Sequence, residues 1–95
     1  MIVYGYTAVN SDGWFQNPNF GETRTKLFLS KEECLKKAFE DYQKVYDSLA
    51  EEGLEPENKK EPENEFIKKA SEDKLAGVIQ LPDYHIQFEF FEQKV

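Results

Sequence analysis

The single thiol and the single imidazole of this 95-residue chain, Cys34 and His85, are the first candidates for catalytic chemistry. The amides at a helix start would lower the pKa of a thiol such as Cys34, but Glu32 and Glu33 beside it act in the opposite direction. His85 alternates with apolar residues in an expected strand and should face solvent. Nothing in the spacing links the two residues. The sequence therefore predicts a packing cysteine and no catalytic residue.

Metal and phosphate chemistry also lack a matching motif. The stretches 10–13 and 17–22 contain several oxygen-bearing side chains, but neither follows the ligand pattern of a calcium loop. The sequence has no glycine-rich phosphate loop, no serine-centred nucleophile elbow and no paired-histidine zinc motif. A single cysteine excludes an internal disulfide and fits a reducing compartment. We expect no metal and no cofactor, and we expect a cytoplasmic protein.

The stretch from Asp12 to Gly21 places three aromatic rings among residues that favour turns. The rings either close as a lid over an uncovered face of a sheet or form the wall of a binding groove. The lid is favoured, because a small domain uses most of its large aromatic side chains in the core. In the groove alternative, rings and polar rim groups form the site, namely Tyr4, Tyr6, Trp14, Phe15, Phe20, Asn17, Asn19, Arg24 and Lys26. Such a groove would stack a nucleotide base or hold a partner's side chain.

A net charge of −7 disfavours direct binding to nucleic acid or to anionic membranes, because both require a basic surface. Two acidic and two basic residues balance within residues 1–30, so the acidic excess lies in the remainder of the chain. Glutamates concentrate after the expected long helix and predict an acidic patch, formed by Glu51, Glu52, Glu55, Glu57, Glu61, Glu63 and Glu65. An exposed, mobile and solubilising loop over residues 54–63 explains the same composition and is the favoured interpretation.

Hydrophobic periodicity predicts the elements that position these residues. Strands are expected at 2–9 and 23–29, the second with one better-buried face. Ser30 to Glu33 matches a capping box, which starts a helix over about 31–52 that Gly53 ends. Its apolar stripe comprises Leu35, Ala38, Phe39, Tyr42, Val45, Tyr46 and Leu49. This helix should be roughly 30 Å long, enough to cross several strands.

The second half of the chain predicts a short helix over about 63–75, which Gly77 stops, and a terminal hairpin. The hairpin strands, 77–81 and 84–92, flank a turn at Pro82-Asp83. In the last strand four apolar residues alternate with polar ones, so that Tyr84, Ile86, Phe88 and Phe90 should face the core.

These elements predict a single α+β domain over residues 1–95, in which an antiparallel sheet of about four strands carries both helices on one face, in the order ββα(α)ββ. The other face then receives Val3, Val9 and Phe91, and Phe28 if its strand keeps register. Phe91 follows Phe90 directly and interrupts the alternation. That interruption leaves open a homodimer formed through the exposed face or through a sheet edge.

By size and charge alone, the chain is similar in type to small inhibitor and immunity proteins, including phage-encoded antagonists of bacterial defence. This similarity implies a non-enzymatic protein that blocks a larger, basic or nucleic-acid-binding protein partner. The acidic patch would steer the encounter and the aromatic surface would anchor it. The alternative is a protein that binds or sequesters a nucleotide or another small molecule through the aromatic loop. No apolar run has membrane-spanning length.

Overall fold

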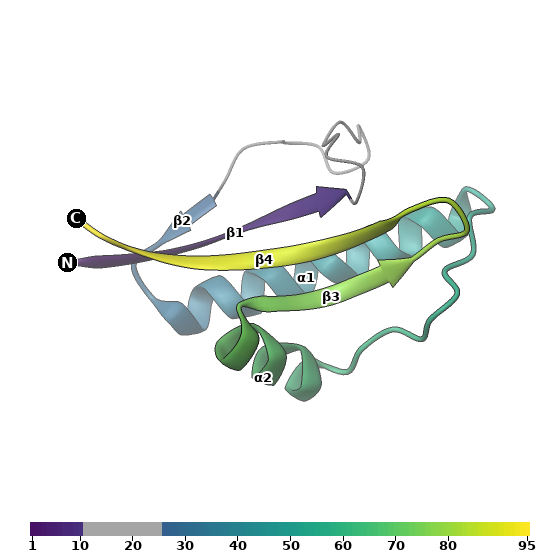
Figure 1. The fold of residues 1–95 in the computed structure, drawn as a ribbon. Coiled ribbons are helices and arrows are strands. Elements are labelled where there is room, and N and C mark those ends of the chain that lie inside the picture. Colours follow the sequence, from purple (N-terminus) through teal and green to yellow (C-terminus); the bar gives the residue numbers. More distant parts are fainter. Residues whose placement is uncertain (11–25) are drawn as a thin grey trace.

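The computed structural model describes residues 1–10 and 26–95. Its elements are β1 (Ile2–Asn10), β2 (Lys26–Phe28), α1 (Lys31–Glu51), α2 (Glu63–Asp73), β3 (Leu75–Gln80) and β4 (His85–Lys94). The strands form one sheet in the order β2-β1-β4-β3, and every neighbouring pair is antiparallel. Both helices pack on the same face of the sheet (Figure 1). This architecture confirms the predicted α+β fold.

The long helix α1 begins and ends at the residues that the sequence indicates. The Ser30 Oγ accepts a hydrogen bond from the backbone N–H of Glu33 at 3.3 Å, as a capping residue does. At the other end Gly53 has φ of 85°, and its N–H donates to Ala50 O at 3.1 Å. The N–H of Leu54 reaches back to Leu49 O at 2.9 Å. These two bonds form a Schellman motif, which satisfies the last carbonyl groups of α1.

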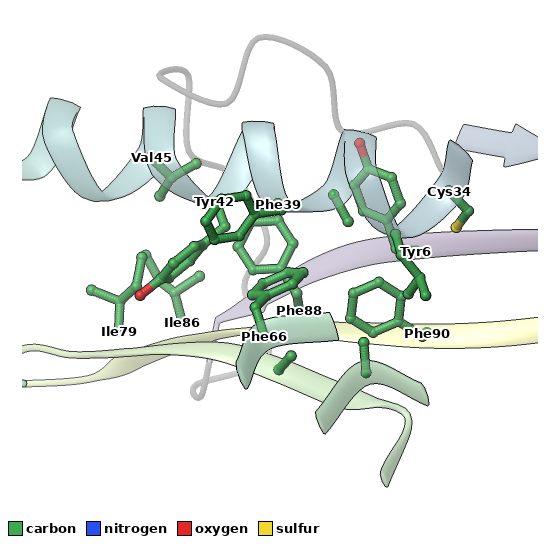
Figure 2. Packing of buried hydrophobic residues seen from close by; sticks show 14 of the residues in the cluster. Tyr6, Cys34, Phe39, Tyr42, Val45, Phe66, Ile79, Ile86, Phe88 and Phe90 are labelled. Atoms are coloured by element: carbon green, nitrogen blue, oxygen red, sulfur yellow. The ribbon is translucent and has the colours of Figure 1, made fainter. Parts of the chain in front are cut away.

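The core between the helices and the sheet is built around aromatic rings (Figure 2). Tyr42 from α1, Phe66 from α2 and Phe88 from β4 are fully buried. The ring centroids of Tyr42 and Phe66 are 5.2 Å apart, and Phe88 meets Tyr42 edge-on at 6.0 Å. The predicted stripe of α1 is buried, except that Tyr46 is only partly covered. One aromatic cluster therefore joins both helices to the sheet.

The short helix α2 is confirmed, but the role predicted for Gly77 was wrong. The helix ends at Asp73, and Lys74 adopts the left-handed conformation with φ of 59°. Gly77 instead lies inside β3, where its φ is 66° and the pairing with β4 is irregular. A Cβ at Gly77 would lie 2.7 Å from the Phe66 ring. Glycine is required there because the rings of both helices approach the strand closely.

The predicted position of Phe28 was also wrong. Phe28 pairs with Tyr4 and lies on the helix-covered face, where its ring stacks on Tyr6 with centroids 6.0 Å apart. Leu27 pairs with Gly5, lies on the helix-free face and is 58% exposed. The better-buried side of this strand is therefore the side of Phe28, and the leucines of the predicted alternation face outward.

The alternation of β4 divides the sheet as predicted. Ile86, Phe88 and Phe90 are buried against the helices, and Tyr84 before the strand packs on the same core. Val3, Val9 and Phe91 lie on the helix-free face. Each alternates along its strand with residues whose side chains face the helices. The ring of Phe91 covers Gly5, where a Cβ would lie 2.3 Å from a ring carbon.

The loop over residues 54–62 is held along α1 and β3. Asn58 Nδ2 donates to Val78 O at 2.6 Å, and Asn58 Oδ1 accepts from Gln80 N at 2.8 Å. The hydroxyl of Tyr46 donates to Asn58 O at 2.8 Å, and Glu57 N donates to Gln80 O at 2.8 Å. Several side chains of the loop are exposed as predicted, but these bonds do not fit a mobile segment. The loop closes the outer edge of β3.

Candidate functional site

Four of the predicted patch glutamates, Glu51, Glu52, Glu55 and Glu57, are exposed and gather where α1 ends and the next loop begins. The turn between β3 and β4 lies at this same end of the molecule (Figure 1). That turn brings the exposed Asp83 to the same end. We call these five residues the acidic end. Sequence reasoning missed Asp83, because it is distant along the chain and only the packing of the hairpin brings it close.

The electrostatics of the acidic end are unfavourable within the folded chain itself. The last turn of α1 contains no basic residue, although the carbonyl end of a helix carries partial negative charge and favours cations. Glu51 and Glu52 add like charge there. Within residues 1–10 and 26–95, Glu51, Glu55 and Glu57 form no ion pair. These carboxylates are therefore well placed to attract cationic groups of another molecule.

Some carboxylates elsewhere in the described chain pair with lysines. Asp47 Oδ1 lies 2.6 Å from Lys60 Nζ, and Glu92 Oε1 lies 3.1 Å from Lys74 Nζ. Glu51, Glu55 and Glu57 differ from these paired side chains.

Glu61 does not belong to an exposed acidic patch. Its side chain is buried at 9% exposure, and its carboxylate accepts from Gly77 N and from Lys69 Nζ, each at 3.2 Å. Glu65 pairs with the same Lys69 at 3.1 Å, and the hydrogen bonds to Glu65 and Glu61 raise the pKa of Lys69. Glu61 thus joins the start of α2 to β3. Glu63 is exposed at the first turn of α2, where a helix favours negative charge.

The aromatic residues of β1 lie on the helix side of the sheet. Tyr6 is 5% exposed, and its hydroxyl donates to the Asp41 carboxylate on α1. Burial and this hydrogen bond raise the pKa of Tyr6 well above its ordinary value. Tyr4 is partly buried against the same core. The ring of Tyr6 is therefore committed to core packing and is not accessible as a groove wall.

The other residues of the predicted aromatic groove lie outside the described residues, as does the side chain of Lys26. They are Trp14, Phe15, Phe20, Asn17, Asn19 and Arg24. The choice between a lid and a groove stays a prediction.

Cys34, on α1, and His85, on β4, point to opposite sides of the sheet. Cys34 is 2% exposed in the core under the first turn of α1, and burial raises the pKa of its thiol to about 11. His85 belongs to the helix-free face, where its Nε2 lies 3.1 Å from Gln87 Oε1. Gln87 Nε2 in turn donates to Glu89 at 2.8 Å. The packing role predicted for Cys34 is confirmed, and the two residues form no catalytic pair.

A small cavity lies beside the first turn of α1, among Tyr4, Cys34 and Phe90. Glu92 crosses its rim, with Oε1 3.1 Å from Lys74 Nζ and 4.0 Å from Lys31 Nζ. The cavity measures about 10 Å³, which is room for about one water molecule. It is too small for a nucleotide. Among residues 1–10 and 26–95, no three His, Cys, Asp or Glu side chains converge as metal ligands.

Comparison with known proteins adds no assignment: no protein-family model, no curated protein and no solved structure matches the chain. In the part of the chain that the structure describes, neither helix combines the length and the apolar character needed to cross a membrane.

Proposed function

We propose that this protein is a non-enzymatic binding protein that attaches through its acidic end to a larger, basic protein and inhibits it. The observation that carries the proposal is the set of exposed carboxylates at the C-terminal end of α1, without a basic residue in the last turn. A basic partner would place cations at a helix end whose own last turn contains no basic residue. Nucleic-acid-binding proteins carry such basic surfaces, so they are the preferred class of partner.

The arrangement of the rest of the surface supports the same proposal. Glu65 on α2 and Glu92 on β4 are already paired with lysines, so these two carboxylates offer less charge to a partner. The acidic end also lies away from the chain termini (Figure 1), on a molecule 43 Å long. A localised charge steers the encounter in one orientation, which a uniform charge does not.

Affinity capture with two charge-matched baits tests this function. The first bait has Glu51, Glu52, Glu55 and Glu57 replaced by glutamine. The control bait loses the same charge at four other exposed positions, through Glu32→Gln, Glu40→Gln, Glu72→Gln and Asp73→Asn. A basic protein should be retained by the wild type and by the control bait but lost with the first bait, and its activity should fall when wild-type protein is added. Equal retention by both baits would contradict the proposal.

The cellular compartment and the type of inhibitor are proposed from the sequence. Its small size, its charge and its buried single cysteine support a cytoplasmic inhibitor of the immunity or phage anti-defence type. The nucleotide-binding alternative depends on Trp14, Phe15 and Phe20 and stays a prediction. Titration of Trp14 fluorescence with nucleotides, compared with a Trp14→Ala variant, tests that alternative directly.

A further inference from the structure

The two edges of the sheet are treated differently. The outer edge of β3 is closed by Glu57 and Asn58, which bond to Val78 O and to both the N–H and the carbonyl of Gln80. β2 is the other edge strand, and among the described residues no strand pairs with its outer side. An edge strand offers a row of backbone donors and acceptors to another strand.

Exposed apolar side chains gather at this open edge. Six large hydrophobic side chains are exposed among the described residues, and five lie at β2 or at the adjoining ends of β1 and β4. They are Met1, Ile2, Leu27, Leu29 and Val95, and we call them the β2 end. Met1 and Val95 are joined by backbone hydrogen bonds, and β1 pairs with both β2 and β4. Leu29 is more exposed than Leu27, at 71%.

We propose that the β2 end binds a second copy of this chain, with the two β2 strands paired antiparallel about a twofold axis. Charge favours a second copy at this end. The β2 end and the acidic end lie at opposite ends of the long axis (Figure 1), so this contact keeps the two acidic ends far apart. Beside this end, Glu92 pairs with Lys74 at 3.1 Å and with Lys31 at 4.0 Å. A contact through the acidic ends themselves would bring like charges within the range of repulsion, about 8 Å at physiological salt.

The β2 sequence is compatible with pairing to itself. With the axis at Leu27, that residue lies opposite Leu27 of the second copy, and Lys26 lies opposite Phe28 of the second copy. The contact is isologous, and it joins two four-stranded sheets into one continuous sheet of eight strands. This inference does not depend on the proposed partner of the acidic end.

Sedimentation equilibrium over a range of protein concentrations tests the dimer. The wild-type protein should associate to a dimer, and Leu27→Lys and Leu29→Lys should shift it to a monomer. Leu54→Lys is the matched control, because Leu54 is also an exposed leucine, at 44%, and lies away from β2. Far-ultraviolet circular dichroism verifies that each variant is folded. A monomeric wild type, or a dimer that both β2 variants retain, overturns the proposal.

A second measurement locates the contact without disturbing its charge. Residues opposite each other in an antiparallel pair have Cα atoms about 4.5 to 5.5 Å apart, which suits a disulfide. Leu27→Cys should therefore form a disulfide-linked dimer under mild oxidation, whereas Leu54→Cys and the wild type, whose Cys34 is buried, should not. Equal cross-linking of the two variants, or none, contradicts pairing at β2. Loss of basic-partner binding by the acidic-end variant, with the dimer intact, separates this proposal from the proposed function.

Discussion

The outer edges of β3 and β2 differ in how the chain satisfies them. At β3, the loop over residues 54–62 supplies a side-chain amide and a backbone N–H to the edge, and it packs against α1. At β2, three residues pair with β1 on one side and carry an exposed leucine. The chain thus seals one edge with its own residues. The β3 edge is therefore closed by the chain itself, and the β2 edge is the one that the proposed dimer would use.

The largest expected effect concerns the closure of the β3 edge. Asn58→Ala removes the amide that bonds to Val78 O and Gln80 N, so the free energy of unfolding should fall by about 2 kcal/mol. Urea denaturation measures this loss. The variant should also associate more strongly than the wild type, because a second edge is now open.

Lys59→Ala is the control for Asn58, since Lys59 is the exposed neighbour in the same loop. Its unfolding free energy and its sedimentation should match those of the wild type. If Asn58→Ala unfolds at the wild-type urea concentration, the loop does not close the edge, and the contrast between the two edges is lost.

A smaller effect is expected where the closing loop reaches α2. The hydroxyl of Tyr42 accepts from the backbone N–H of Glu61 at 2.7 Å in the buried core. Tyr42→Phe leaves that N–H without its partner and should lower the free energy of unfolding by about 1 kcal/mol. Chemical denaturation at neutral pH checks this value.

The same tyrosine gives the stability a pH dependence. Burial raises the pKa of Tyr42 from 10.0 to about 12, so the folded state holds the proton more tightly than the unfolded state. Its contribution is fully present below pH 10 and is lost as the pH rises from 10.0 to about 12. In Tyr42→Phe, stability should decline less steeply over that interval. The burial of Tyr6 and Cys34 raises their pKa values too, so part of the alkaline decline should remain.

Tyr84→Phe is the control for Tyr42. Tyr84 packs on the same core, but its hydroxyl makes no hydrogen bond within the described part of the chain. Its free energy of unfolding at neutral pH should match that of the wild type. A Tyr42→Phe variant as stable as Tyr84→Phe would show that the Tyr42 hydroxyl does not couple the loop to α1.

Local patterns were sufficient to predict most of the fold. The helix start at Ser30, the stripe of α1 and the alternation of β4 each depend on neighbouring residues, and each is confirmed. The exceptions depend on residues far apart in sequence. Gly77 is required by rings that arrive from both helices, and no pattern around Gly77 reveals them.

The candidate site shows the same limit. The run of glutamates after α1 identified most of the acidic end, but the burial of Glu61 depends on Lys69 and on the backbone of β3. Asp83 joins the acidic end only through the hairpin. In the same way, the closure of β3 depends on Asn58, which composition assigns only to a loop. Charge along the sequence predicts where carboxylates concentrate, whereas tertiary contacts decide which of them remain exposed.

The smallest expected effect concerns the end of α1, from which the closing loop starts. Glu51 is exposed in the last turn, where the helix dipole disfavours a negative charge. Glu51→Lys should therefore raise the free energy of unfolding by about 0.3 to 1 kcal/mol at low salt, and added salt should diminish the gain. Glu32→Lys is the mirror control, because Glu32 lies in the first turn of the same helix, where negative charge is favourable. That variant should lose stability by a similar amount. Thermal unfolding of both variants at low and high salt measures the pair, and equal shifts of the same sign would contradict a dipole at α1. A stabilised Glu51→Lys variant that binds the basic partner more weakly would show that the acidic end is retained for binding at a cost to folding.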